Sequence, residues 1–219
     1  TLTGISEGSL KEFLGGQWKP LIDLIVSGKI KGVAGVVGCS NLTAGGHDVL
    51  TVELTKELIK RDIIVLSAGC SSGGLENCGL MTPEAADLAG DSLKEVCKSL
   101  GIAPVLNFGP CLAIGRLEMV ATALAAEIGI DIPQLPLVLS APQWLEEQAL
   151  ADGCFGLALG LPLRLGQQPF IAGSELVVNV LTEGLKDITG GQVLVEIDPV
   201  KAADQMEAII LERRKGLNI

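Results

Sequence analysis

The sequence contains no tyrosine, and only six of its 219 residues are aromatic. Nearly half of the residues are nevertheless hydrophobic, so Val, Leu, Ile and Ala must fill the core. This length suits one α/β domain and is short for two. A positive mean hydropathy with so few aromatics indicates more apolar surface than one domain can cover, which favours a partner chain or a neighbouring domain.

Basic residues are also scarce, with 16 Lys and Arg against 26 Asp and Glu, for a net charge of −10. This balance argues against a nucleic-acid-binding protein, which needs a basic face to meet phosphates. No apolar run reaches the 18 residues that a membrane helix needs. The first residues, TLTGISEGSLKEF, lack the pattern of a signal peptide and an initiator methionine. We therefore expect a cytoplasmic protein without a membrane partner, either processed or part of a longer chain.

Several catalytic motifs are missing. The sequence has no G-x-S-x-G elbow, no P-loop, no Cys-x-x-Cys pair and a single histidine, His47. These absences disfavour a serine hydrolase, a P-loop nucleotidase, a zinc ribbon and a two-histidine metal site. A lone histidine that opens a helix is more typical of a surface or capping residue than of a ligand. The stretch GCSSGG could hold a phosphate, so a nucleotide-binding α/β domain stays a weaker alternative.

Short apolar runs alternate with amphipathic segments along the chain. This alternation predicts a doubly wound, mainly parallel, Rossmann-like α/β sheet with helices on both faces. We expect residues 1–30 to form a helical lead-in and residues 31–219 to form the domain. Predicted strands are 33–38, 63–67, 104–108, 136–140, 155–160 and 193–197, and predicted helices lie near 47–60, 83–100, 115–128, 143–152, 174–187 and 199–215.

Three of the predicted strands end in a glycine followed closely by a cysteine. VVGCSN contains Cys39, VLSAGCSS contains Cys70 and VLNFGPC contains Cys111. Because the carboxyl ends of parallel strands share one edge of a sheet, the three thiols should lie along that edge. Each precedes a helix, whose free N–H groups stabilise a thiolate.

Three thiolates at one edge suit a soft metal or an iron–sulfur cluster. Three ligands are one short of a closed four-coordinate site, so His47, Cys78, an exogenous ligand or another domain must complete it. The alternative is that cysteine is only a small residue tolerated in tight turns. Cys97 and Cys154 are expected to be inert core residues.

The segments around these cysteines resemble the C-terminal domain of nickel-dependent, anaerobic carbon monoxide dehydrogenases, a family related to the hybrid-cluster proteins. The likeness covers essentially the whole chain. It is most specific in ELIKRDIIVLSAGCSSGGLENCGLMTPEA, PVLNFGPCLAIGR, SAPQWLEEQALADG and GGQVLVEIDPVKAADQMEAIILERRKGL.

The resemblance implies that Cys39, Cys70 and Cys111 are three of the ligands of an iron–sulfur cluster, with or without nickel. In that family the cluster converts CO and water to CO2, two protons and two electrons. The remaining ligands would come from an upstream domain or a partner chain. The resemblance also implies an electron-transfer partner and a homodimer.

Three positions depart from the family pattern. Gln148 stands where the family has a lysine that acts on the bound carboxyl group and its protons. Asp152 replaces an apolar isoleucine that faces the cluster, and Pro110 removes a backbone donor beside Cys111. An amide neither titrates nor has a positive charge, and the loss of an acid–base group typically costs about 10²–10⁴ in rate.

These changes predict an oxidoreductase of the carbon monoxide dehydrogenase type, active as part of a larger chain or assembly, with impaired CO oxidation. One alternative is a hybrid-cluster-like reductase of a small nitrogen compound such as hydroxylamine. Another is a non-catalytic remnant that binds a metal or a partner.

Overall fold

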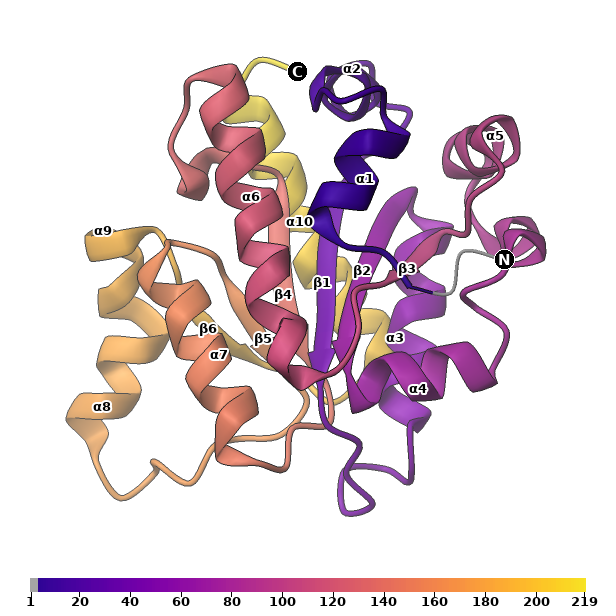
Figure 1. Ribbon diagram of the computed structural model, residues 1–219. Coiled ribbons are helices and arrows are strands. Elements are labelled where there is room, and N and C mark those ends of the chain that lie inside the picture. The colour runs from indigo at the N-terminus through magenta and orange to yellow at the C-terminus, as the bar shows by residue number, and fades with distance from the viewer. Residues whose placement is uncertain (1–3) are drawn as a thin grey trace.

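The computed structural model describes residues 4–219, in which six strands form one parallel sheet (Figure 1). The strand order is β3-β2-β1-β4-β5-β6, so the chain builds outward from β1 in one direction and then returns to build from β4 in the other. This is the doubly wound order of a Rossmann-like fold, as predicted. The strands are β1 (Gly32–Gly38), β2 (Ile63–Gly69), β3 (Val105–Asn107), β4 (Leu137–Ala141), β5 (Leu163–Leu165) and β6 (Val193–Val195).

Helices follow the strands and cover the sheet. Three short 3₁₀ segments, Pro83–Leu88, Cys111–Ala113 and Ile132–Gln134, and one π-helical turn, Val180–Gly184, interrupt the regular pattern. The α-helices are α1 (Glu7–Phe13), α2 (Lys19–Val26), α3 (Val49–Lys60), α4 (Cys70–Asn77), α5 (Asp91–Leu100), α6 (Ile114–Ile128), α7 (Glu147–Ala158), α8 (Glu175–Asn179), α9 (Leu185–Thr189) and α10 (Pro199–Gly216).

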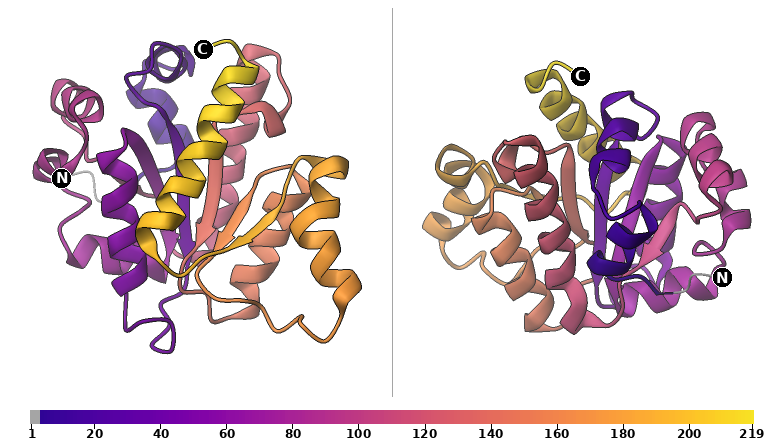
Figure 2. Two further views of the ribbon diagram at one scale, coloured as in Figure 1. Left: turned by 180° about the vertical axis from the view of Figure 1, so that it is seen from behind. Right: turned by 45° about the horizontal axis from the view of Figure 1, so that its top comes forward.

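The central strands are buried on both faces because helices lie in front of and behind the sheet. Every residue of β1 is buried. A side chain at Gly35 would meet Leu117 of α6, whereas one at Gly32 would meet Ile210 of α10. Helices α6 and α7 therefore cover the front face in Figure 1, and α3 and α10 cover the back face, as the reverse view in Figure 2 shows. Continuous apolar runs are the sequence signature of such strands.

One predicted strand is wrong. Residues 155–160 begin in the second half of α7, and the fifth strand is 163–165. A short apolar run fits a buried helix as well as a strand, and the glycines Gly153 and Gly156 here let α7 lie close against Leu163 and Leu139. The predicted helix 143–152 is correspondingly shifted to 147–158.

One other helical prediction needs correction. The predicted helix 83–100 is a 3₁₀ segment followed by α5, because residues 89 and 90 have extended backbone between them. The stretch GCSSGG, residues 69–74, forms the N-cap and the start of α4, so it is a helix N-terminus. The structure contains no helix long and apolar enough to cross a membrane among the residues it describes.

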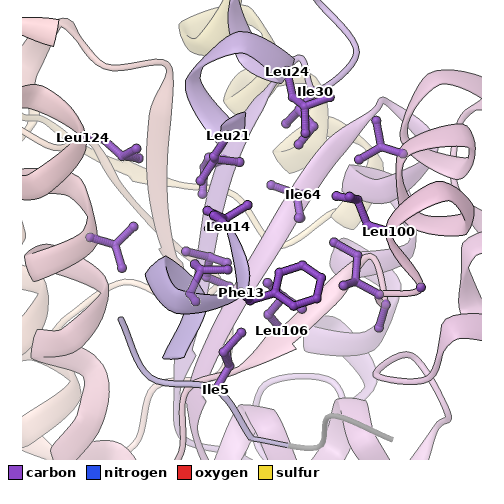
Figure 3. Close-up of a pocket in the computed structure, with 18 of the residues that line it drawn as sticks. Ile5, Phe13, Leu14, Leu21, Leu24, Ile30, Ile64, Leu100, Leu106 and Leu124 are labelled. Carbon is purple, nitrogen blue, oxygen red and sulfur yellow. The ribbon is translucent and has the colours of Figure 1, made fainter. Parts of the chain in front are cut away.

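The first described residues include α1 and α2, which lie over the front face beside α6 (Figure 1). Beneath them is an apolar cavity of about 50 Å³, shown in Figure 3, whose walls include Phe13, Leu14, Ile64 and Leu106. Apolar cavities of this kind hold water poorly. None of the six cysteines is among its lining residues, so it lies apart from the site described next.

Candidate metal centre

The three predicted ligand cysteines lie at the carboxyl ends of three adjacent strands, the bottom edge of the sheet in Figure 1. Cys39 directly follows β1, Cys70 is the first residue of α4 after β2, and Cys111 opens the 3₁₀ turn after β3. Cys70 and Cys111 are exposed, and Cys39 is half-buried. The parallel topology thus places all three along one edge, although 31 and 41 residues separate them in the chain.

The glycines before these cysteines are neighbours across the strands. Gly38 and Gly69 are register partners, and the Gly69 N–H donates to the Gly109 carbonyl at 2.9 Å. All three have positive φ, between 90° and 111°. A Cβ on Gly69 would lie 2.6 Å from the Gly38 carbonyl oxygen, so only glycine fits there. The recurring glycine therefore allows the sharp turn by which the chain leaves each strand just before the cysteine.

Side chains fix the ends of these turns to one another. The Ser71 hydroxyl lies 3.2 Å from the Gly38 carbonyl oxygen and 3.3 Å from that of Cys39, which ties α4 to the end of β1. In the third turn, the Asn107 side chain accepts a hydrogen bond from the Gly109 N–H at 2.8 Å. Such local bonds are the usual way in which Ser and Asn stabilise turns.

The loop after β4 is interlocked with the loop after Cys39. The Gln143 amide is fully buried and donates to the carbonyls of Asn41, Ala44 and Gly46, while its oxygen accepts from Thr51. Sequence reasoning missed this role of Gln143. Its position in SAPQW gave no sign of it, since an isolated glutamine is usually a surface residue.

Helix α7 starts beside Cys39. The Glu146 backbone N–H points to Cys39 Sγ at 3.4 Å, a contact that suits a thiolate. Gln148 lies in the first turn of α7 and is exposed, and Asp152 lies one turn further on and is partly buried. The two are four residues apart and so share one face of the helix. Both therefore lie on the helix whose start adjoins the first cysteine.

A second acidic residue, Glu118 of α6, lies against the same helix and was missed in the sequence. Its side chain is 4% exposed. Burial, together with the negative charge of Asp152, raises the pKa of Glu118 to about 7. Burial also raises the pKa of Asp152. Glu118 stands among the apolar residues of the helix IGRLEMVATALAAEI, and this pattern gives no sequence signal of such a pairing.

The side chains of the described residues do not form a complete metal site. Among residues 4–219, no three Cys, His, Asp or Glu side chains gather closely enough to hold a metal ion. His47 is exposed and its Nδ1 lies 2.7 Å from Asp48 Oδ2, and Cys78 is exposed at the end of α4. The convergence of the three thiols on one group remains a prediction.

The other two cysteines differ from each other. Cys97 is buried in α5 as expected, and burial raises its pKa to about 12. Cys154 was expected to be a core residue and is exposed on α7, because the apolar run after it is helix and not a buried strand.

The donor set fits a cluster whose remaining ligands come from outside these residues. Thiolates are the ligands that iron–sulfur clusters take, and three are available at one edge of the sheet. Exposed leucines accompany them: Leu42 after β1 is 72% exposed, Leu112 after β3 is 85% exposed, and Leu145 after β4 is 55% exposed. An apolar rim around polar donors is typical of a surface that another domain covers.

Comparison with known proteins agrees with this fold. The Prismane/CO dehydrogenase family matches residues 4–200. The carbon monoxide dehydrogenase of Methanocaldococcus jannaschii is 59% identical over 219 residues, which are all of this chain and 35% of that protein. The chain thus spans about a third of the length of the curated relatives it matches.

Solved structures of carbon monoxide dehydrogenases have the same fold as this chain. Carbon monoxide dehydrogenase from Thermococcus sp. AM4, in a nickel-free crystal structure, matches with a TM-score of 0.95 and 44% identity over 98% of this chain and 34% of that one. An acetyl-CoA synthase/carbon monoxide dehydrogenase with NiZn[Fe4S4] and NiNi[Fe4S4] clusters matches with a TM-score of 0.93 and 32% identity, over 98% of this chain and 34% of that one. The family match over most of the chain and these likenesses lead to one conclusion: the chain belongs to the Prismane/CO dehydrogenase family.

Proposed function

We propose that this chain supplies Cys39, Cys70 and Cys111 as ligands to an iron–sulfur active-site cluster, with or without nickel, in a larger oxidoreductase of the carbon monoxide dehydrogenase type. The observation behind this proposal is the position of three Gly-Cys turns on three adjacent parallel strands. When bound, such a cluster supplies the redox centre at which CO and water yield CO2, two protons and two electrons.

The cysteine edge also indicates what else the complete enzyme would contain. The exposed leucines beside the cysteines favour coverage by the upstream part of a longer chain or by a partner chain, which would supply the remaining ligands. An electron-transfer protein must accept the two electrons. We further propose a homodimer and retain residues 1–30 as a lead-in to the domain of residues 31–219.

CO oxidation is proposed to be impaired. Gln148 offers an amide at the position of the family's lysine, so it gives no positive charge to a developing carboxylate. Asp152 adds negative charge to the same helix face. This combination also favours the second candidate function, reduction of a small nitrogen compound such as hydroxylamine. The supporting observation is the match to the Prismane/CO dehydrogenase family.

The test uses the full-length protein that contains this chain, purified without oxygen. Iron, sulfide and nickel are measured, and thiols are alkylated before and after the metal is removed by a chelator. We expect the exposed Cys70 and Cys111 to react only after metal removal. Mass spectrometry of the peptides reads out each thiol.

The other cysteines are internal controls. Cys154 is exposed and should react in both states, whereas the buried Cys97 should react in neither. Cys70→Ser should lower the iron content, and the matched Cys154→Ser should leave it unchanged. Equal alkylation of Cys70 and Cys111 in both states, or a metal-free full-length protein, would contradict the proposal and favour the non-catalytic remnant.

A further inference from the structure

Two carboxyl groups that are not predicted cluster ligands, those of Glu118 and Asp152, meet between α6 and α7. Glu118 points from α6 towards α7, and its Oε1 lies 3.7 Å from the position of a Cβ added to Gly156. Asp152 is four residues before Gly156 and therefore lies on the same face of α7. The two acidic side chains thus occupy one helix–helix interface.

This interface offers them no compensating partner. Glu118 Oε2 and Asp152 Oδ2 are buried, and neither forms a hydrogen bond within residues 4–219. The nearby Arg116 of α6 is turned away, since its guanidinium binds Glu7 at 2.7 Å. An unpaired buried carboxylate is costly, and two adjacent ones are costlier still.

The elements packed against α7 add no charge at this point. Strands β4 and β5 contact its glycines through Leu139 and Leu163. The buried Arg164 follows Leu163 in β5 and therefore projects to the opposite face of the sheet. Helix α9 meets α7 at Thr189, whose hydroxyl donates to the Leu157 carbonyl at 2.9 Å. On α7 itself, the acidic Glu147 is exposed to solvent. The titratable groups that face this interface are therefore Glu118 and Asp152.

Two such carboxyls titrate as one system. Burial and the negative charge of Asp152 raise the pKa of Glu118 to about 7, and burial raises the pKa of Asp152. The pair therefore retains one proton below neutral pH and releases it near neutral pH, where a proton-transferring group is most effective.

The pair also lies close to the cysteine edge. Helix α7 starts at the residue after Glu146, whose N–H points to Cys39 Sγ. Gln148 is in the first turn, and Asp152 is one turn deeper on the same face. Cys111 and Glu118 are similarly joined, because the 3₁₀ turn at Cys111 runs directly into α6.

We propose that Glu118 and Asp152 form a proton-sharing carboxyl pair that accepts protons from the reaction at the cysteine edge. This inference rests on the proposed function. Each proton released from water in CO oxidation would bind to the pair's free carboxylate oxygen and later pass to solvent, while the electrons leave to the electron-transfer partner. The pair would thus accept protons one helical turn from Gln148. It would not replace the positive charge of the family's lysine.

The first measurement is a pH titration of the pair by infrared spectroscopy on the full-length protein. The wild-type spectrum minus that of Glu118→Gln should show a protonated-carboxyl band that disappears with a midpoint near pH 7. Asp152→Asn removes the neighbouring charge and should move the midpoint of Glu118 to lower pH. Glu147→Gln, at an exposed position on α7, is the matched control and should leave the band unchanged.

Stability gives an independent readout. Because the folded protein holds this proton up to about pH 7 and a free carboxyl only to about 4.5, stability should fall as pH rises between these values. Glu118→Gln should flatten this dependence. A Glu118 that titrates near its ordinary pKa, with no response to Asp152→Asn, would overturn the inference. If Glu118→Gln does not fold, the wild-type spectrum minus that of Asp152→Asn, followed over the same pH range, decides alone.

The catalytic measurement separates this inference from the proposed function. Glu118→Gln removes the proton acceptor and leaves the Asp152 charge in place, so it should lower the rate about 10²-fold, the lower end for loss of a proton-transferring group. Asp152→Asn should shift the pH profile of the rate to lower pH. An unchanged rate and profile would overturn the catalytic part of the inference. A wild-type protein that binds no cluster would contradict the proposed function and remove the catalytic part, while the infrared titration would still report on the pair.

Discussion

At the residue scale, Gln148 is the departure from the family pattern that bears most directly on charge in the proposed reaction. It is exposed in the first turn of α7, so its replacement by a longer side chain meets no packing barrier. The functional difference between an amide and an ammonium group is charge, since both are flexible and polar.

Gln148→Lys should therefore raise the rate of CO oxidation by about 10²-fold or more in the full-length protein, because it restores a positive charge and an acid–base group. The measurement is the rate of electron transfer from CO to an artificial acceptor. Gln148→Met, of similar length and without charge, is the control and should give no gain. A Gln148→Lys rate equal to that of the wild type would show that this position does not limit the reaction.

The sequence allowed prediction of residues that lie in a recurring local motif. It did not reveal residues whose role depends on contacts between distant segments. The Gly-Cys turns could be found because three strands end alike, and Gln148 and Asp152 because a resemblance marks their positions. Glu118 and Gln143 could not, because their roles depend on α6 meeting α7 and on one loop meeting another. A sequence contains no local mark of either contact.

At the element scale, α7 is held against the sheet by two glycines. A Cβ at Gly153 would lie 2.6 Å from a Leu163 methyl carbon, and one at Gly156 would clash with Leu139. Close helix–sheet approach of this kind has a steric requirement that the hydrophobic pattern does not reveal. The apolar run after Gly153 consequently looked like a strand, whereas the longer runs of β1 and β2 were predicted correctly.

Gly156→Ala should destabilise the protein by about 1–3 kcal/mol, the usual cost of overpacking a core contact. Gly115→Ala is the matched control, because Gly115 lies in α6 with nothing within 4 Å of an added Cβ. That change should be neutral or stabilising by up to about 1 kcal/mol, since alanine favours helix. Thermal or denaturant unfolding compares the two, and equal effects would argue against close packing of α7.

At the scale of the whole molecule, the sheet order follows from alternation of strands and helices, and the doubly wound class was predicted from it. The order β3-β2-β1-β4-β5-β6 places the three cysteine turns on adjacent strands, which sequence alone suggested only through their similar contexts. The apolar surplus in the composition also has a structural counterpart: exposed leucines flank the cysteine edge, and Phe170 is 96% exposed.

These leucines should be covered in the full-length protein. Hydroxyl-radical footprinting is expected to modify Leu42 and Leu112 as slowly as the fully buried Ile210, although this chain by itself leaves them 72% and 85% exposed. Rapid modification of both in the full-length protein would show that the cysteine edge faces solvent, and the remaining ligands would then have no covering domain to come from.

The register of Gly38 with Gly69, and the bond from Gly69 to Gly109, also fix an order of events in biogenesis. The cysteines become neighbours only after three parallel strands have paired, and parallel pairing over long crossovers is slow because distant segments must meet. If the three thiols hold the proposed cluster, delivery of iron and sulfide to this edge would therefore come after folding of the sheet. A machinery that loads the cluster would need to recognise a folded surface, and not a nascent cysteine-containing peptide.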